Sequence, residues 1–198
     1  MCYVDAITEY NKKSGICGIV AGICAVYHND ATFHMTVDRE TDPVKIILDQ
    51  QKKFLDGIKN TKLWGETESF TKEFVPSFKL ESAYQAICKG PSAVLAQSGK
   101  NVETIAMTPK GVVKLLELNG VKSQMTDNPH DQTYARCILG FGRGGSGSYS
   151  DLKHWVYFFN GNMAWNRGAS QNYDAVVKNE GTSLKPYTQV THKIAIGS

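Results

Sequence analysis

The longest apolar run in the chain covers residues 17–27, CGIVAGICAVY. Apolar residues would occupy every side of a helix over this run, as is typical of a helix buried inside a domain. Ser14 fits as the N-cap residue, which places Cys17 in the first turn. The run therefore predicts a buried helix with a cysteine at its start. Its small residues would allow close approach to another element: Gly18, Ala21, Gly22 and Ala25.

Other segments before residue 120 also have the apolar spacing of helices: residues 43–58, 81–88 and 108–120. Thr108 is a suitable N-cap for the last of them. Residues 30–42, by contrast, predict a loop or a short strand around residues 32–37. Residues 121–132 are predicted to be a polar loop.

Four segments of the C-terminal part have the composition and length of strands: residues 134–141, 154–159, 163–166 and 188–196. Helices therefore come first and strands last, which predicts an α+β fold. We find no repeat and no domain boundary, so residues 1–198 are predicted to form a single domain. In it, an N-terminal helical part with the buried cysteine-bearing helix would pack on a C-terminal antiparallel sheet.

The two middle strands are predicted to form a β-hairpin around Asn160-Gly161. This dipeptide tolerates positive φ at both turn positions better than other pairs. Residues equidistant from the turn face each other, so we expect His154 to lie opposite Asn166 and Arg167. A side-chain amide there could orient the imidazole.

Composition favours a globular protein and argues against nucleic-acid-binding and membrane-spanning classes. The chain has 198 residues, of which 41% are hydrophobic and 21% charged, so it is globular. A net charge of +3 without a dense basic cluster argues against a nucleic-acid partner. No apolar run reaches the roughly 18 residues of a membrane span, and none resembles a Sec signal peptide.

The five cysteines are odd in number and include no C-x-x-C pair. They therefore predict neither a disulfide framework nor a zinc site, and we expect no metal or cofactor. Thiols of this kind fit a reducing compartment. Apart from Cys17, most are expected to be small buried residues.

Cys17 stands out because the first turn of a helix has unpaired N–H groups and the positive end of the macrodipole. Both stabilise a thiolate, and such sites lower a cysteine pKa from about 8.5 to as low as about 3.5. Cys24, two turns further on, would have no such help. Cys17 is therefore a candidate nucleophile, and the alternative is one more buried small residue.

Among the histidines, His154 is the preferred partner for Cys17 because it opens a predicted strand. His192 is the main competitor, but its strand has no following partner strand. The other histidines are less suitably placed, near a helix end or in a polar loop: His28, His34 and His130.

Residues 140–145 match G-x-G-x-x-G by letter but lead into no helix, so they do not predict a dinucleotide site. We interpret the loop before His154 as a substrate-gating flap or a linker between strands. Its candidate residues are Gly142, Arg143, Gly144 and Gly145.

A cysteine at the start of a buried N-terminal helix, with a strand histidine 137 residues later, resembles the papain-like cysteine proteases. Asn11 lies six residues before Cys17, where that family carries an oxyanion-hole glutamine. Asn166 fits as the third triad member, with Asp151 as an alternative. The cathepsin run Cys-Gly-Ser-Cys-Trp is absent. The closest pattern is that of bacterial papain-fold effectors, which include proteases and glutamine deamidases delivered into host or rival cells.

The resemblance implies a cysteine hydrolase that cleaves an amide bond through Cys17, His154 and Asn166, with Asn11 and the Cys17 N–H as oxyanion donors. A protein or peptide substrate is expected, with a cognate inhibitor or immunity protein as a further partner. Glutamine deamidation, cell-wall amide hydrolysis and acyl transfer use the same groups. Location would be the cytoplasm, or a target cell reached by a non-Sec route. The rival class is a non-catalytic interaction or immunity-type protein.

Overall fold

The computed structural model describes residues 16–96, 104–128, 136–143, 147–160, 162–165 and 189–197. The helices are α2 (Cys17–Asn29), α3 (Ala31–Arg39), α4 (Pro43–Ile58), α5 (Lys62–Lys72), α6 (Leu80–Lys89), α7 (Pro91–Ala96), α8 (Pro109–Leu118) and the short α9 (Ser148–Asp151). The strands are β1 (Ser123–Met125), β2 (Arg136–Gly142), β3 (Leu152–Phe159), β4 (Asn162–Trp165) and β5 (Gln189–Ile196).

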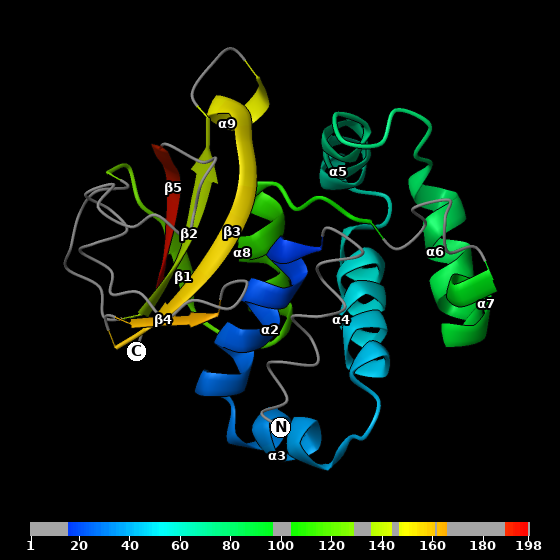
Figure 1. Cartoon of the computed structure of the whole chain (residues 1–198), viewed down its shortest axis with the longest axis horizontal. Coiled ribbons are helices and arrows are strands. Elements are labelled where there is room, and N and C mark those ends of the chain that lie inside the picture. The colour runs from blue at the N-terminus through cyan, green and yellow to red at the C-terminus, as the bar shows by residue number, and fades with distance from the viewer. Residues whose placement is uncertain are drawn as a thin grey trace.

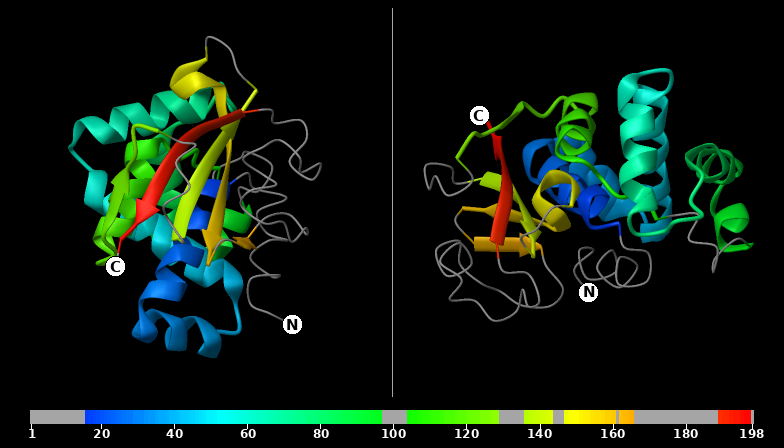
Figure 2. Two further views of the ribbon diagram at one scale, coloured as in Figure 1. Left: turned by 90° about the vertical axis from the view of Figure 1, so that its left-hand side faces the viewer. Right: turned by 90° about the horizontal axis from the view of Figure 1, so that it is seen from above.

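The strands form one five-stranded sheet in the order β1-β5-β2-β3-β4, with every neighbouring pair antiparallel. The long helices lie on one side of this sheet, with α2 and α8 nearest to it and α6 and α7 farthest away (Figures 1 and 2). This arrangement confirms the predicted α+β class and the helix-on-antiparallel-sheet architecture. None of the described helices combines the length and the apolar character needed to cross a membrane.

The core spans both faces of the sheet. Side chains on the helix side join one large cluster with α2, α4 and α8, including Ile138, Trp155 and Tyr157. Alternate residues form a second buried cluster on the other face: Cys137, Leu139, Phe141, Val156, Phe158 and Val190. The central strands β2 and β3 are therefore nearly continuous apolar runs, because both of their faces are buried.

Helix α2 lies between the sheet and α4, and its residues from Gly18 to Val26 are all buried. Its small residues allow close contacts. A methyl group placed on Gly18 would overlap the Cβ of Met107 and lie 3.1 Å from Cδ1 of Trp155. One on Gly22 would lie 2.5 Å from a methyl group of Leu115 on α8. The predicted small-residue face is thus a packing face.

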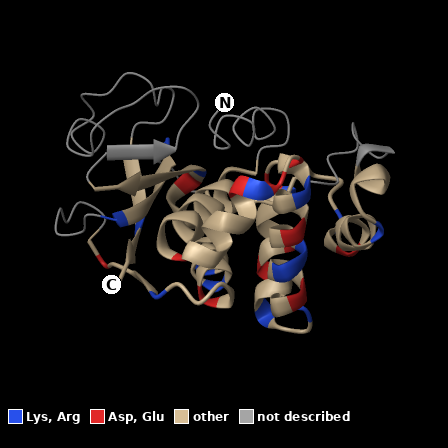
Figure 3. Ribbon diagram, turned by 90° about the horizontal axis from the view of Figure 1, so that it is seen from below, with Lys and Arg blue, Asp and Glu red and all other residues tan. Residues whose placement is uncertain are grey.

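The amphipathic helices follow their sequence signals. α4 has Pro43 in its first turn and is capped by the Asp42 carboxylate, which accepts from the Val44 N–H at 2.9 Å. Charges of both signs run along the outer side of α4 (Figure 3). α8 is capped by Thr108, whose Oγ1 accepts from the Gly111 N–H at 3.0 Å.

Three local predictions were wrong. The N-cap of α2 is Ile16 rather than Ser14, so the helix begins at Cys17. Residues 31–39 form α3, because the Asp30 side chain caps it and accepts from the Thr32 and Phe33 N–H groups. Strand β1 lies in the predicted polar loop, paired with β5. Both partners of β5, β1 and β2, precede it in the chain, and within the described residues no strand follows it.

The hairpin is confirmed, with Asn160 at φ 51° and Phe159 paired with Asn162. A register shift after Tyr157 makes Trp165 its partner, and the described β3–β4 pairing ends there. Within the described residues, the pairing of β3 with β4 does not reach His154. The residues expected opposite His154, Asn166 and Arg167, lie outside the described residues.

Gly18→Ala is expected to lower the free energy of unfolding by about 1–3 kcal/mol, because the added methyl group overpacks a dry contact. Gly65 on α5 is the matched control, since nothing lies within 4 Å of the position that its Cβ would take. Gly65→Ala should raise the free energy of unfolding by about 0.5–1 kcal/mol through reduced backbone entropy of the unfolded chain. Urea denaturation measures both, and a neutral or stabilising Gly18→Ala would contradict the close packing of α2.

Because the His28 ring is partly buried, we expect the free energy of unfolding to depend on pH. Its ring stacks on Phe159 with centroids 4.4 Å apart, and burial lowers its pKa, with further lowering by the charges of His34 and Arg136. The unfolded chain then binds more protons than the folded protein below about pH 6.5, so acidification should reduce the free energy of unfolding. His28→Phe should flatten this slope. Comparison at about pH 7.5, where the ring is neutral in both states, separates lost packing from titration.

Candidate active site

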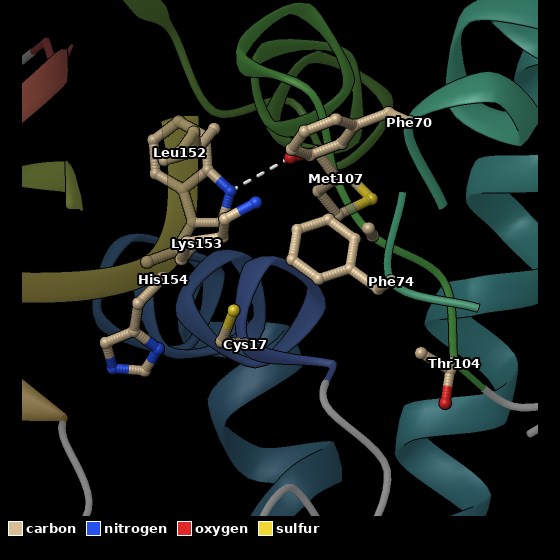
Figure 4. Close-up of a pocket in the computed structure, with 10 residues that line it drawn as sticks. Cys17, Phe70, Phe74, Thr104, Met107, Leu152, Lys153 and His154 are labelled. Atoms are coloured by element: carbon tan, nitrogen blue, oxygen red, sulfur yellow. Dashed lines mark hydrogen bonds between the residues drawn. The ribbon is translucent and has the colours of Figure 1, made fainter. Parts of the chain in front are cut away.

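Cys17 and His154 lie in the wall of one cavity of about 130 Å³, although 137 residues separate them in the chain. Cys17 comes from the start of α2 and is partly exposed, and His154 comes from the first half of β3 and is buried. In Figure 4 the imidazole lies beside Cys17 with a ring nitrogen turned toward it. The structure thus places the thiol and the imidazole that the sequence singled out in the wall of one cavity.

The start of α2 has an unusual cap. Ile16 occupies the N-cap position and makes no side-chain hydrogen bond to the helix, and the first turn contains no acidic residue. The N–H groups in the first turn of a helix have no acceptor within the helix itself. With the macrodipole, they favour negative charge at this point, which is where the Cys17 side chain lies.

A tight left-handed turn leads into β3. Tyr149, Ser150 and Asp151 have φ values of 53°, 57° and 57°. For residues other than glycine, this conformation costs about 1–2 kcal/mol each. The turn passes so close to Gly142 that a Cβ there would lie 2.6 Å from the Asp151 carbonyl oxygen. Gly142 therefore lets the chain reverse directly before the strand that carries His154.

The remaining cavity wall comes from α5 and from residues 104–108. The Ala106 N–H donates to Thr71 Oγ1 on α5 at 3.1 Å. On the other side, the Trp155 indole N–H donates to the Met107 carbonyl at 2.9 Å, as Figure 4 shows. These two hydrogen bonds tie the segment to α5 and β3. Trp155 is buried, so it acts both as a core aromatic and as part of the cavity wall.

Lys153 and two phenylalanines complete the lining, and the sequence did not single them out for this site. Lys153 Nζ lies 2.8 Å from Asp151 Oδ1 and 4.8 Å from the ring centroid of Phe74. Phe70 and Phe74 come from the end of α5 and the turn after it. No sequence signal links these positions to Cys17, because they meet it only through tertiary packing.

The other described cysteines differ in exposure. Cys24 and Cys137 are buried, as predicted, and burial raises the pKa of the Cys137 thiol to about 12. Cys88 on α6 is exposed, which corrects the expectation that it is protected. Within the described residues, no group of three His, Cys, Asp or Glu side chains is placed to hold a metal ion.

The competing histidines lie elsewhere. His192 on β5 is half-buried near the Trp155 and Tyr149 rings, at centroid distances of 6.3 and 6.1 Å, and burial lowers its pKa. It does not line the cavity that holds Cys17. His34 stacks on Tyr27 at 3.9 Å, and His28 packs on β3.

Several predicted site residues lie outside the described residues: Asn11, Asn166, Gly144 and Gly145, as does His130. Of the predicted flap, Gly142 ends β2 and Arg143 is exposed directly after it. Asp151, the alternative third triad member, has its carboxylate on Lys153.

No family model, no curated protein and no solved structure matches this chain. The chemistry of the site is therefore argued from its own geometry.

Trp155→Phe is expected to lower the free energy of unfolding by about 1–3 kcal/mol, because it leaves the buried Met107 carbonyl without its donor. Trp64→Phe on α5 is the matched control, since that side chain is half-buried and packs on Tyr84. Urea denaturation followed by circular dichroism measures both variants. If the two substitutions destabilise equally, the Trp155–Met107 hydrogen bond does not hold the cavity wall.

Proposed function

We propose that this protein is a cysteine hydrolase of papain-like fold that cleaves an amide bond in a protein or peptide. The observation that carries the proposal is the meeting of Cys17 and His154 in one cavity wall. A partly exposed thiol at a helix start, beside an imidazole fixed on a strand, is the arrangement of an activated nucleophile. The chain order, cysteine helix first and histidine strand later, supports the papain-like assignment.

The reaction starts with transfer of the Cys17 proton to His154. The thiolate attacks the amide carbonyl, a C–S bond forms, and the imidazolium donates its proton to the departing amine as the C–N bond breaks. Water, deprotonated by His154, then attacks the thioester and releases the acid and the thiol. If ammonia leaves from a glutamine side chain, the same steps give deamidation.

The position of Cys17 at the start of α2 supports this chemistry in a second way. Negative charge develops on the substrate oxygen during attack, and the Cys17 backbone N–H lies at the positive end of the helix. One such donor is typically worth about 3 kcal/mol of transition-state stabilisation. By resemblance, Asn11 would add a second donor and Asn166 would orient His154. Delivery into a target cell is likewise proposed only from the resemblance to bacterial papain-fold effectors.

Alkylation by iodoacetamide, located by mass spectrometry at a series of pH values, tests the proposal. We expect Cys17 to be labelled preferentially at about pH 6, because a thiolate–imidazolium pair keeps it reactive well below the usual cysteine pKa. His154→Gln should remove this low-pH reactivity. Exposed Cys88 is the internal reference for a surface thiol, and buried Cys137 for a protected one.

His192→Gln is the matched control, because His192 is also a strand histidine, is half-buried and does not line the cavity. It should leave the labelling profile of Cys17 unchanged. Should Cys17 be as inert as Cys137, or its profile be insensitive to His154→Gln, the enzyme proposal fails. The protein would then belong with non-catalytic binding proteins.

A further inference from the structure

The cavity beside Cys17 has one distinctly apolar side. Phe74, Phe70 and Met107 lie on the side of Cys17 away from His154 (Figure 4). Phe70 is held edge-on between Phe74 and Tyr149, with ring centroids 5.3 and 5.2 Å away. Phe70 is therefore fixed, whereas Phe74 is 38% exposed at the solvent side.

The size of the cavity suits one apolar side chain. Its volume of about 130 Å³ is close to that of apolar cavities, about 150 Å³, that bind benzene. An aromatic ring or a branched aliphatic chain would fill it and remove the exposed face of Phe74 from water. Edge-on contacts with Phe70 and Phe74 would favour an aromatic ring further.

Charge at the cavity excludes a cation. The described lining includes Lys153 and no carboxylate, and the Lys153 ammonium lies over the Phe74 ring. Its partner Asp151 is on the turn before β3 and does not line the cavity. A lysine or arginine side chain entering here would meet a like charge at short range.

The position of His154 determines which part of the substrate enters the apolar side of the cavity. His154 must donate its proton to the departing amine, so that amine lies on the imidazole side of Cys17. The residue that supplies the scissile carbonyl then extends the other way, toward the phenylalanines. We propose that this cavity binds the side chain of that residue and selects an uncharged aromatic or branched aliphatic one over a cationic one. The inference rests on the proposed cysteine chemistry.

N-acetyl amino-acid chloromethyl ketones built on phenylalanine, leucine, alanine and lysine test this selection. In each, the Cys17 sulfur attacks the methylene carbon, a thioether forms and chloride leaves, while the amino-acid side chain occupies the acyl-side position. The rate of Cys17 modification, followed by intact mass and peptide mapping, should be at least about tenfold higher for phenylalanine than for alanine or lysine.

Two variants of cavity residues test which side chains cause the preference for an aromatic compound. Phe74→Ala should reduce the phenylalanine-to-alanine rate ratio by about threefold or more. Lys153→Gln should raise the relative rate of the lysine compound by about three- to tenfold, because the like charge is gone. Met35→Ala is the matched control, since Met35 on α3 is also an exposed large apolar residue, 52% exposed, and does not line the cavity.

The outcomes separate the inference from the proposed function. If His154-dependent labelling of Cys17 is present but all four compounds react equally, the side-chain selection is wrong and the hydrolase proposal stands. An unchanged rate ratio in Phe74→Ala overturns the selection in the same way. If no compound modifies Cys17 in a His154-dependent manner, the proposed function fails and the selection fails with it.

Discussion

The arrangement of the site depends on the close approach of α2 to β3 and to residues 104–108. Gly18 makes it possible, because a side chain there would overlap Met107. The hydrogen bond from the Trp155 indole to the Met107 carbonyl joins β3 to the same segment. Since Cys17 precedes Gly18 and His154 precedes Trp155, the contact that packs the core also brings the thiol and the imidazole into one cavity wall.

Local signals predicted much of the fold. The apolar period with Pro43 at its start defined α4, the Thr108 cap defined α8, and the Asn160 turn defined the hairpin. The prediction failed at residues 31–39, where the Asp30 carboxylate accepts hydrogen bonds from two backbone N–H groups and favours a helix despite the β-branched composition. Strand β1 was missed because its three residues gain their conformation from pairing with β5.

The candidate site, like the fold, could be predicted from the sequence only in part. Cys17 and His154 could be singled out because each follows from a local signal, a helix start and a strand start. The cavity wall could not, since Phe74 reaches Cys17 through the turn after α5 and the bond between Thr71 and Ala106. The shift in the β3–β4 register, likewise, is invisible in a pattern that repeats every two residues. Nothing in the sequence marks Lys153 as a cavity residue except that it directly precedes His154.

Reaction of the native protein with 1,3-dibromoacetone, followed by peptide mass mapping, tests directly whether the Cys17 thiol and the His154 imidazole share one cavity wall. A sulfur and a ring nitrogen that share one cavity wall can each displace one bromide, which joins them through a three-carbon bridge. We expect a crosslinked peptide that contains Cys17 and His154, absent in His154→Gln and present in His192→Gln. Modification of Cys17 without a link to His154, or links formed elsewhere at the same rate, would contradict it.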